Sequence, residues 1–388
     1  MKGHRYPVGE GDVAVIGAST AGLFAAYLLA RHGFRVRLFD QRQKLGPPQR
    51  TLIVTNRINQ VLGFAPHEAV VNHIQEIELL SQNRRMVVKL GAPDLVLERE
   101  RLVQLLAGRA QQEGVEIELG YSFLELEGSP DGLSLALYNR GTDRVKEVKA
   151  GVLIGADGVW SQVARAVGRD DHSRVAIWQV RVALPPGAGE HTVRVWFHKE
   201  STQFFYWLIP ESKHRGVVGL VCEDQEKAKG NLEQFLDAYG FEALEFQAAD
   251  VALYHPDLPA SIQLEGSEVF LVGDAGGQVK VTTVGGVVTG LRGARAVAGA
   301  LFQEGMGREF RGLRRELYLH FLMRSLLNRF SDSDYDHLLD LVSNRTEGVL
   351  QTYTRDELGG AFFKLLLAQP RLLLLAARSL IRIGEGKR

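Results

Sequence analysis

Three glycine-containing segments, each with an acidic residue in it or shortly after it, are the parts of this sequence best suited to chemistry. They are residues 17–22 (GASTAG) followed by Asp40, residues 155–158 (GADG), and residues 273–274 (GD). Glycine-rich turns let backbone N–H groups approach phosphates closely, and carboxylates accept hydrogen bonds from hydroxyl groups. The three segments therefore predict a site for a ligand that carries both phosphates and hydroxyls.

The first segment lies inside a predicted βαβ unit, which implies a parallel sheet. Residues 12–16 form a short β-rich run, a helix-like stretch reaches His32, and a second strand over residues 34–39 ends at Asp40. The spacing nearly matches the dinucleotide-binding fingerprint, with Ser19 at the position of its middle glycine. The helix N-terminus favours a phosphate, and Asp40 can accept hydrogen bonds from a ribose hydroxyl.

The same turn also resembles the G-x-S-x-G nucleophile elbow of hydrolases. Ala21 replaces the second glycine of that motif, the first strand of a chain is early for an elbow, and Asp40 then has no role. A βαβ turn that binds no ligand is the other alternative. We favour nucleotide binding over both.

The remaining pattern predicts an α/β protein with a β-rich middle and a helical C-terminal part. Short apolar alternation predicts strands over residues 74–80, 86–90, 115–119, 152–154, 192–198, 204–209, 216–222 and 269–272, and a β-meander over residues 123–148. Helical spacing predicts helices over residues 99–113 and 232–239 and throughout residues 304–388.

Composition excludes several classes of protein. The 388 residues carry 46 basic and 46 acidic side chains, so the basic excess of a nucleic-acid-binding protein is absent. The 42 glycines exceed the roughly 27 that average usage predicts, which suggests backbone that approaches a ligand closely. The eleven histidines show no metal-ligand spacing, so we expect no metal site.

Cellular location is also constrained by the sequence. Cys222 is the single cysteine, residues 1–10 do not resemble a signal peptide, and the apolar tracts near Pro370 are far shorter than the ~20 residues of a spanning helix. We therefore expect a cytoplasmic protein that does not cross a membrane.

The three segments occur in the order seen in single-Rossmann flavoproteins related to p-hydroxybenzoate hydroxylase, which this sequence resembles. Within that superfamily it is most similar to the geranylgeranyl reductase family. The run over residues 272–298 looks like that family's flavin-contacting segment, and the matching positions are Gly273, Asp274, Gly276, Lys280, Thr282, Thr283, Gly285, Gly286 and Gly290. A second match is residues 205–210 (FYWLIP), which resemble the family's Tyr-x-Trp-x-Phe-Pro substrate motif.

The resemblance implies FAD as the cofactor, with Asp40 at the adenosine ribose, Arg99 on the pyrophosphate side, Asp157 at the nucleotide site and Asp274 at the ribityl hydroxyls. The full cofactor site that it implies is Gly17, Ser19, Thr20, Ala21, Gly22, Asp40, Gln41, Arg99, Asp157, Gly273, Asp274, Gly285, Gly286 and Val287.

The implied substrate contacts are Phe205, Trp207 and Pro210. Some positions depart from the family pattern. Phe205 and Ile209 replace a Tyr and a Phe, and Val281 and Val284 replace a Pro and a Gly.

The implied fold is a Rossmann-like FAD-binding domain with a mixed β-sheet substrate domain and a C-terminal helical region. The expected boundaries are residues 1–72, 95–168 and 255–305 for the first, residues 73–94 and 169–254 for the second, and residues 306–388 for the third.

The implied activity is an FAD-dependent reductase that saturates C=C bonds of a geranylgeranyl-type prenyl chain or a similar long apolar substrate, with hydride from the reduced flavin N5. A second dinucleotide fingerprint is missing, so the electron donor is either transiently bound NAD(P)H or a ferredoxin-like carrier. No catalytic residue is assigned, and Tyr206, His198 and a bound water are all conceivable proton donors.

Two other functions remain open. The first is a monooxygenase of the same fold, a hydroxylase or a halogenase, since FYWLIP also resembles the Trp-x-Trp-x-Ile-Pro motif of flavin-dependent halogenases. Lys44, in a loop near Asp40, is a poor candidate for the lysine that those enzymes need. The second is a non-catalytic flavin-binding electron carrier, against which the large, aromatic-rich middle of the chain counts.

The C-terminal part contains three features of weaker meaning. Asp332, Asp334 and Asp336 resemble the start of a calcium loop, but His337 and Ser343 stand at its required Gly and Glu, so we expect helix capping by Ser333 or Asp334 there. A basic face formed by Arg308, Arg311 and Arg315 is expected to be solvated rather than to bind a lipid phosphate. Residues 362–383 combine leucines with basic residues, and two interpretations stay open: contact with an anionic membrane surface, or packing over the substrate cavity.

Overall fold

A six-stranded sheet contains the predicted βαβ unit. The computed structural model describes residues 13–46, 50–169, 173–257, 261–302, 307–343, 351 and 353–381. The strand order is β16-β17-β10-β1-β2-β6. Five strands are parallel and β16 runs antiparallel; the bounds are β1 Val13–Ile16, β2 Val36–Asp40, β6 Glu116–Leu119, β10 Val152–Gly155, β16 Ser261–Leu264 and β17 Ser267–Leu271. Strands β1 and β10 are buried throughout, as expected for a parallel sheet that is covered on both faces.

The order of strands reverses between β1 and β10. From β1 the chain proceeds outward to β2 and β6 on one side, and β10 and β17 extend the sheet on the other side. In open α/β sheets, ligands bind at the carboxyl ends of the strands where this reversal occurs. The turns that follow β1, β10 and β17 contain the three glycine segments identified in the sequence.

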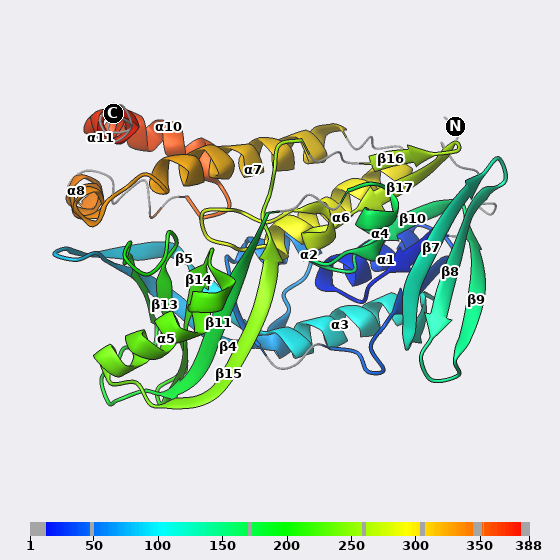
Figure 1. Ribbon diagram of the computed structural model, residues 1–388, viewed down its shortest axis with the longest axis horizontal. Helices are drawn as coiled ribbons and strands as arrows, with labels where there is room; N and C mark the ends of the chain where they lie inside the picture. Colours follow the sequence, from blue (N-terminus) through cyan, green and yellow to red (C-terminus); the bar gives the residue numbers. More distant parts are fainter. Residues whose placement is uncertain are drawn as a thin grey trace.

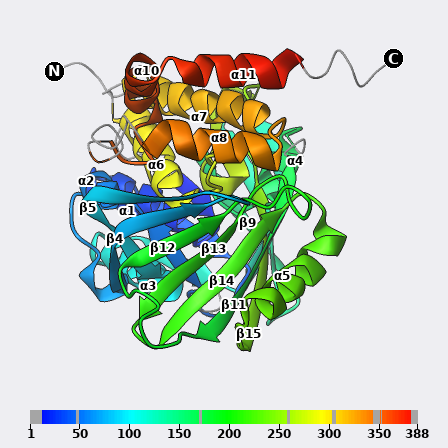
Figure 2. The same ribbon diagram turned by 90° about the vertical axis from the view of Figure 1, so that its left-hand side faces the viewer.

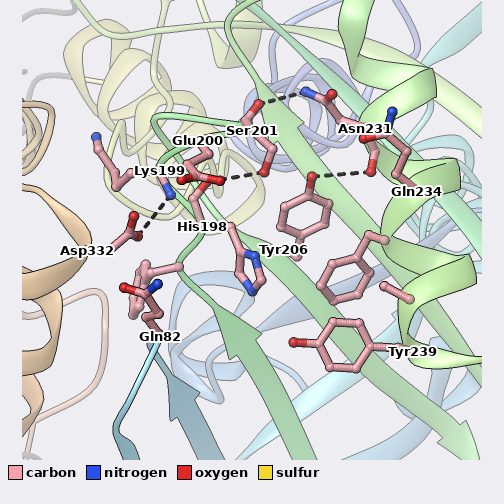
Figure 3. Close-up of a pocket in the computed structure, with 13 residues that line it drawn as sticks. Gln82, His198, Lys199, Glu200, Ser201, Tyr206, Asn231, Gln234, Tyr239 and Asp332 are labelled. Atoms are coloured by element: carbon pink, nitrogen blue, oxygen red, sulfur yellow. Dashed lines mark hydrogen bonds between the residues drawn. The ribbon is translucent and has the colours of Figure 1, made fainter.

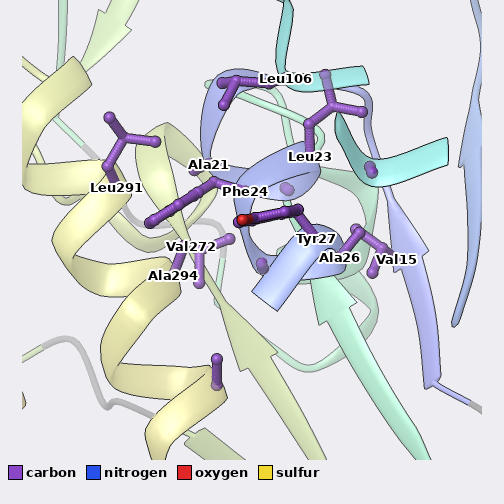
Figure 4. Close-up of a cluster of buried hydrophobic side chains, with 14 of the residues drawn as sticks. Val15, Ala21, Leu23, Phe24, Ala26, Tyr27, Leu106, Val272, Leu291 and Ala294 are labelled. Carbon is purple, nitrogen blue, oxygen red and sulfur yellow. The ribbon is translucent and has the colours of Figure 1, made fainter. Parts of the chain in front are cut away.

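Three helices pack around this sheet: α1 (Thr20–Arg31), α3 (Arg99–Gln112) and α6 (Val287–Leu301). Figure 4 shows side chains of α1, among them Phe24, lying against Leu291 and Ala294 of α6 in a buried apolar cluster. Small residues let α6 approach both α1 and the turn after β17, since a Cβ at Gly290 would lie 3.5 Å from the Cβ of Ala21 and 3.1 Å from the backbone of Gly273.

An eight-stranded mixed sheet forms the second layer, in the order β15-β11-β14-β13-β12-β4-β5-β3. The bounds are β3 Thr51–Val54, β4 Val70–Leu80, β5 Arg85–Glu98, β11 Arg174–Ala183, β12 Thr192–Trp196, β13 Tyr206–Ser212, β14 Arg215–Cys222 and β15 Ala243–Ala252. One face of this sheet packs against helix α5 (Gln225–Tyr239), as Figure 2 shows. The other face contacts Val279 and Val284, which lie after β17. They belong to residues 272–298, which we call the flavin-type segment.

The β-meander forms a small third sheet of β7 (Tyr121–Ser129), β8 (Gly132–Asn139) and β9 (Arg144–Ala150). Short helices connect the larger elements: α2 Arg57–Leu62, η1 His67–Ala69, α4 Gln162–Ala166 and η2 Gly273–Gly276.

The C-terminal part forms a helical layer of α7 (Gly307–Leu327), α8 (Asp332–Ser343), α10 (Leu358–Ala368) and α11 (Arg371–Ile381). Figures 1 and 2 both show this layer at the top of the molecule. In the described part of the chain, no helix is long and apolar enough to cross a membrane.

The α/β fold class with C-terminal helices is confirmed, and most predicted strands lie within two residues of their observed positions. The prediction omitted β3, β11, β15 and β16, and it began α5 too late. Strand β3 pairs with residues 95–98 of β5 in the eight-stranded sheet. The division of the chain into domains stays a prediction.

Helix α8 shows which residue caps it. Ser331, rather than Ser333, caps its start, because Ser331 and Asp334 exchange hydrogen bonds between side chains and backbone N–H groups.

Two helical glycines with different surroundings, Gly22 in α1 and Gly108 in α3, give a prediction about stability. An added methyl group at Gly22 overlaps the carbonyl oxygen of Gly17, whereas one at Gly108 of α3 meets no atom within 4 Å. We expect Gly22→Ala to destabilise the protein by about 1–3 kcal/mol through overpacking. The matched change Gly108→Ala removes the entropic cost of a helical glycine and should stabilise by about 0.5–1 kcal/mol. Urea unfolding of both variants checks this, and equal effects would contradict it.

Candidate cofactor and substrate site

The turn after β1 is built for close approach of its backbone to β10. Gly17 has a φ of +108°, and a side chain there would overlap the carbonyl group of Ala156. Ser19 has an ordinary φ of −77° and caps α1, since its Oγ accepts a hydrogen bond from the N–H of Gly22 at 3.1 Å. The serine therefore fits the middle position of the fingerprint without backbone strain, next to Thr20 and Ala21 at the helix start.

Asp40 lies at the end of β2 and holds this turn in place. Its Oδ2 accepts a hydrogen bond from the Ala18 N–H at 2.7 Å, and its Oδ1 accepts one from the Arg42 N–H at 2.8 Å. Each carboxylate oxygen has two lone pairs, so both keep capacity for a ribose hydroxyl. The neighbouring Gln41 is exposed beside it.

Asp157 lies in the loop between β10 and α4 and is hydrogen-bonded within that loop. Its carboxylate accepts hydrogen bonds from the Ser161 hydroxyl at 2.5 Å and from the N–H groups of Gln162 and Val163 at 2.7 and 3.2 Å. Burial raises the pKa of Asp157, and these hydrogen bonds oppose that shift. The structure thus shows Asp157 shaping the loop between β10 and α4, and its contact with a nucleotide stays a prediction.

Two guanidinium groups face the third segment. Arg99 begins α3, and its N–H donates to the carbonyl oxygen of Arg50 at 3.0 Å, which holds the two arginines side by side. Burial and the charge of Arg99 lower the pKa of Arg50 to about 10, and the charge of Asp274 opposes this shift. Burial also lowers the pKa of Arg99 and raises that of Asp274, each partly offset by the opposite charge nearby.

This site carries more positive than negative charge. Neither the Arg50 nor the Arg99 guanidinium has a hydrogen-bond or ion-pair partner among the residues that the structure describes, and one carboxylate, that of Asp274, lies near both. A pyrophosphate supplies the missing negative charge and the acceptor oxygens that guanidinium groups prefer. The sequence did not single out Arg50, because it lies in an irregular loop and becomes part of the site when β3 pairs with β5.

The start of α6 adds unpaired backbone donors. Gly286 is its N-cap and has no side chain to accept a hydrogen bond from the first turn, which begins at Val287. A side chain at Gly286 would lie 3.2 Å from Oδ1 of Asp274, and one at Gly285 would lie 3.3 Å from Cε of Lys280. Asp274 and the helix N-terminus therefore converge on one place, where an anionic ring or a hydroxyl-rich chain is favoured.

Val284, which stands where the family pattern has glycine, has a strained backbone conformation. Its φ is +50°, a conformation that a β-branched residue rarely adopts and that typically costs about 1–3 kcal/mol. The turn is held by a hydrogen bond from the Val284 N–H to the carbonyl oxygen of Lys280 at 2.7 Å, and the valine side chain is buried.

A buried ion pair ties the C-terminal part to this turn. Lys280 donates to Asp356, whose carboxylate also accepts a hydrogen bond from the Thr55 hydroxyl. Arg57 donates to the carbonyl oxygen of Asp356 at 2.7 Å. Burial alone would raise the pKa of Asp356, but the charge and hydrogen bond of Lys280 and the hydrogen bond of Thr55 lower it to about 2.

Arg324 of α7 makes a second connection. Its guanidinium donates to the carbonyl oxygens of Val281 at 3.0 Å, Thr282 at 2.8 Å and Gln203 at 2.9 Å. Gln203 precedes β13 and residues 281–282 belong to the flavin-type segment, so this one buried side chain fixes the two against each other.

The FYWLIP segment places its side chains alternately on the two faces of the eight-stranded sheet. Phe205, Trp207 and Ile209 lie in the same apolar cluster as Val279 and Val284 of the flavin-type segment. We call these five side chains the apolar wall. The indole of Trp207 packs directly over the backbone of Gly219 on β14, where any side chain would overlap it. The carbonyl oxygen of Pro210 accepts a hydrogen bond from Asn72 at 2.9 Å, so the proline acts through the backbone.

Tyr206 and His198, two of the conceivable proton donors, lie on the opposite face of the sheet from the apolar wall. Tyr206 stacks on Phe235 of α5 at 4.2 Å between ring centroids, and its hydroxyl donates to the Asn231 carbonyl oxygen at 3.3 Å. Tyr206 and His198 line a cavity of about 520 Å³ between β13 and α5. Figure 3 shows this cavity, with Tyr239 also beside it. This cavity is large, but the sheet separates it from the apolar wall, so we do not assign the reaction to it.

The residues present fit FAD. Trp207 Nε1 and Thr283 Oγ1 are buried and have no hydrogen-bond partner among the residues that the structure describes. The uncompensated arginines suit the pyrophosphate, Asp40 and Asp274 suit hydroxyl groups, and the start of α6 suits the flavin ring. Among the described residues, no three His, Cys, Asp or Glu side chains are grouped so as to hold a metal.

Comparison with known proteins agrees with this site. The family model described as FAD binding domain matches residues 10–309. Digeranylgeranylglycerophospholipid reductase 2 of Methanothermobacter thermautotrophicus is 30% identical over 299 residues, covering 71% of this chain and 74% of the relative. The chain belongs to the geranylgeranyl reductase family of FAD-dependent oxidoreductases. FAD is therefore its cofactor, as the sequence predicted.

Solved structures show the same fold. A geranylgeranyl bacteriochlorophyll reductase-like protein of Thermoplasma acidophilum has a TM-score of 0.78 at 17% identity, covering 95% of this chain and 99% of that one. A flavin-dependent halogenase has a TM-score of 0.63 at 18% identity, covering 92% of this chain and 77% of that one. The fold is thus shared by family members and by oxygen-using flavoenzymes.

The arginine pair gives the first prediction for this site. Arg50→Met should weaken FAD binding about 10- to 100-fold, the loss of a hydrogen bond to a charged group worth about 1.5–3 kcal/mol. The apoprotein should be as stable as the parent or more so, because the variant removes repulsion between two neighbouring cations. Fluorescence titration with FAD and urea unfolding check the two parts, with the exposed Arg101→Met as control. Unchanged FAD affinity would contradict the assignment.

The buried ion pair gives the second prediction. A carboxyl whose pKa is lowered on folding stabilises the protein above its unfolded pKa of about 3.9. That stabilisation is lost as the pH falls through the folded pKa of about 2. Asp356→Asn should cost about 3–5 kcal/mol at pH 7, because Lys280 stays buried without its partner, and should flatten the stability profile between these two pKa values. The double change Lys280→Met with Asp356→Leu should recover most of the loss.

The control for this experiment is Asp340→Asn, which breaks the exposed pair of Arg84 with Asp340 at 2.8 Å. Exposed pairs contribute about 0–1 kcal/mol. If urea unfolding at pH 7 gave equal small losses for both asparagine variants, the buried pair would not be a major tie between the C-terminal part and the turn.

Proposed function

We propose that this protein reduces C=C bonds of a prenyl chain of the geranylgeranyl type, or of a similar long apolar substrate. The observation that carries the proposal is the apolar wall, because it joins Phe205, Trp207 and Ile209 of the substrate sheet to Val279 and Val284 of the flavin-type segment. A hydrocarbon chain is the ligand that such a surface favours beside a flavin. Relatives named as digeranylgeranylglycerophospholipid reductases support the same choice.

The protein's own residues supply orientation and a dry environment in this proposal. Reduced FAD supplies the hydride when it is bound. The Trp207 indole, seated on Gly219, gives the substrate a fixed flat surface, and the N-terminus of α6 stabilises negative charge on the flavin ring. Arg324 holds the chain just before β13 against the flavin-type segment, because its guanidinium donates to carbonyl oxygens of both.

The electron donor and the membrane belong to the same proposal. A prenyl lipid is drawn from a membrane, so peripheral membrane contact accompanies this function. NAD(P)H or a ferredoxin-like carrier supplies the electrons. The role of the substrate contacts Phe205, Trp207 and Pro210 is likewise proposed.

The test is anaerobic reoxidation of the reduced holoenzyme by a detergent-dispersed geranylgeranyl lipid. We expect the flavin to reoxidise in proportion to the bonds reduced, and the product to gain two hydrogens per bond by mass spectrometry. Trp207→Ala should lower kcat/KM at least about tenfold by removing the wall's largest side chain. Tyr206→Phe, one residue away on the opposite face, should leave kcat unchanged.

Two results would overturn the proposal. Reoxidation no faster with the lipid than with buffer would exclude reduction of this substrate class. Product formation that requires and consumes oxygen would instead indicate the monooxygenase alternative. The halogenase form of that alternative has little support here, because Lys44 lies exposed in the loop beside Asp40.

A further inference from the structure

The outward side of α7 carries exposed apolar and basic residues together. Leu313, Leu317, His320 and Arg324, spaced at helical intervals, are buried toward the rest of the molecule. Arg311, Arg315, Tyr318 and Leu322 have the same spacing but are offset by two residues, so they lie on the opposite side of the helix. Tyr318 and Leu322 are 45% and 46% exposed.

Helix α11 repeats this combination. Leu375 and Ser379 are buried, whereas Leu373 and Leu374 are 54% and 65% exposed. The nearby Leu367, at the end of α10, is 81% exposed. Figures 1 and 2 both place α7, α10 and α11 in the layer at the top of the molecule.

These exposures are concentrated in one region. Of the thirteen large apolar side chains that are exposed among the described residues, five lie on α7, α10 and α11. Solitary exposed leucines need no explanation, but a group of them beside basic residues is typical of an interaction surface.

The charge of the exposed side chains on these helices indicates that a partner would be anionic. The whole chain has equal numbers of acidic and basic residues, yet residues 358–381 contain Lys364, Arg371 and Arg378 and no Asp or Glu. Together with Arg311 and Arg315, this makes the outward side of α7, α10 and α11 locally cationic, whereas the four aspartates of the layer lie on α8. Leucines flanked by arginines on an amphipathic helix match a bilayer interface with anionic head groups.

We propose that the outward side of α7, α10 and α11 docks on an anionic lipid surface. We call it the lipid-facing layer and define it by Arg311, Arg315, Tyr318, Leu322, Leu367, Arg371, Leu373, Leu374 and Arg378. The inference deepens the proposed function and rests on it for the substrate, because docking brings the enzyme to the membrane that holds a prenyl lipid. The leucines enter the acyl boundary, and the arginines bind the phosphate groups. For Arg311 and Arg315 this replaces the solvated face expected from the sequence, because exposed apolar side chains lie beside them.

A second copy of the chain is the competing occupant. Two such layers would bring basic residues of both copies together, which charge repulsion opposes. A bilayer with anionic lipid has the opposite charge and an apolar interior, so it satisfies both features of the layer at once.

The experiment is sedimentation of the holoenzyme with vesicles, without a reductant. Vesicles of phosphatidylcholine alone are compared with vesicles that also contain phosphatidylglycerol. We expect binding to the anionic vesicles that weakens at raised ionic strength. The double variant Leu373→Asp with Leu374→Asp should bind at least about tenfold more weakly. Replacing Arg371 or Arg378 by Gln, which removes one positive charge, should weaken binding about fivefold each.

The matched control is Leu244→Asp, since Leu244 is 59% exposed on β15 in the eight-stranded sheet. It should bind vesicles like the parent. Absence of binding to anionic vesicles, equal binding to neutral ones, or equal loss in the Leu244 variant would overturn the proposal. So would a dimer, detected by light scattering, that the Leu373 and Leu374 changes convert to a monomer.

The failure of this proposal is separable from failure of the proposed function. Vesicle binding is scored without turnover, and prenyl reduction is scored with lipid dispersed in detergent. A chain that reduces the dispersed lipid but ignores vesicles keeps its function and loses the docking surface.

Discussion

The close approach of three backbone turns is the constraint on which the rest of this structure depends. The turn after β1 contacts the carbonyl group of Ala156 after β10, and Gly290 of α6 contacts the turn after β17. Side chains at Gly17, Gly22 or Gly290 would separate these elements. Because these three positions are glycines, the N-termini of α1 and α6 lie close to one region. Unpaired N–H groups and two arginines make the electrostatic potential of that region positive.

The same two arginines suit the site to the pyrophosphate of FAD. Burial lowers the pKa values of both Arg50 and Arg99, and repulsion between neighbouring cations adds to this shift, whereas the charge of Asp274 opposes it. Asp274 offsets part of this charge but lies close to Gly286, beside the start of α6. The carboxylate is thus placed to accept hydroxyl groups, while the arginines are left for phosphates.

The parts that sequence predicted are those in which chemistry is local. Glycines near a strand end and an acid at the next strand end, such as Gly17 and Asp40, sit within one supersecondary unit, so their spacing reveals them. Arg50 and the pairing of Lys280 with Asp356 could not be predicted in this way. The latter joins residues 76 positions apart, and nothing near Asp356 marks it as a partner.

Two features of the β-rich middle have separate physical causes. Strand alternation places Tyr206, one of the conceivable proton donors, on the opposite face from Phe205 and Trp207. Strands β11 and β15 were omitted because polar residues such as Gln179 and Gln247, which hydrogen-bond to each other across the sheet, interrupt the apolar pattern.

Val284 shows how cofactor and substrate requirements meet at one residue. The family pattern has glycine here, and the observed φ of +50° is one that glycine adopts without cost. This chain retains a strained valine whose side chain is buried in the apolar wall. The strain persists because hydrogen bonding to Lys280 and the ion pair of that lysine with Asp356 hold the turn. The valine side chain thus adds apolar volume to the wall at a position where glycine would leave none.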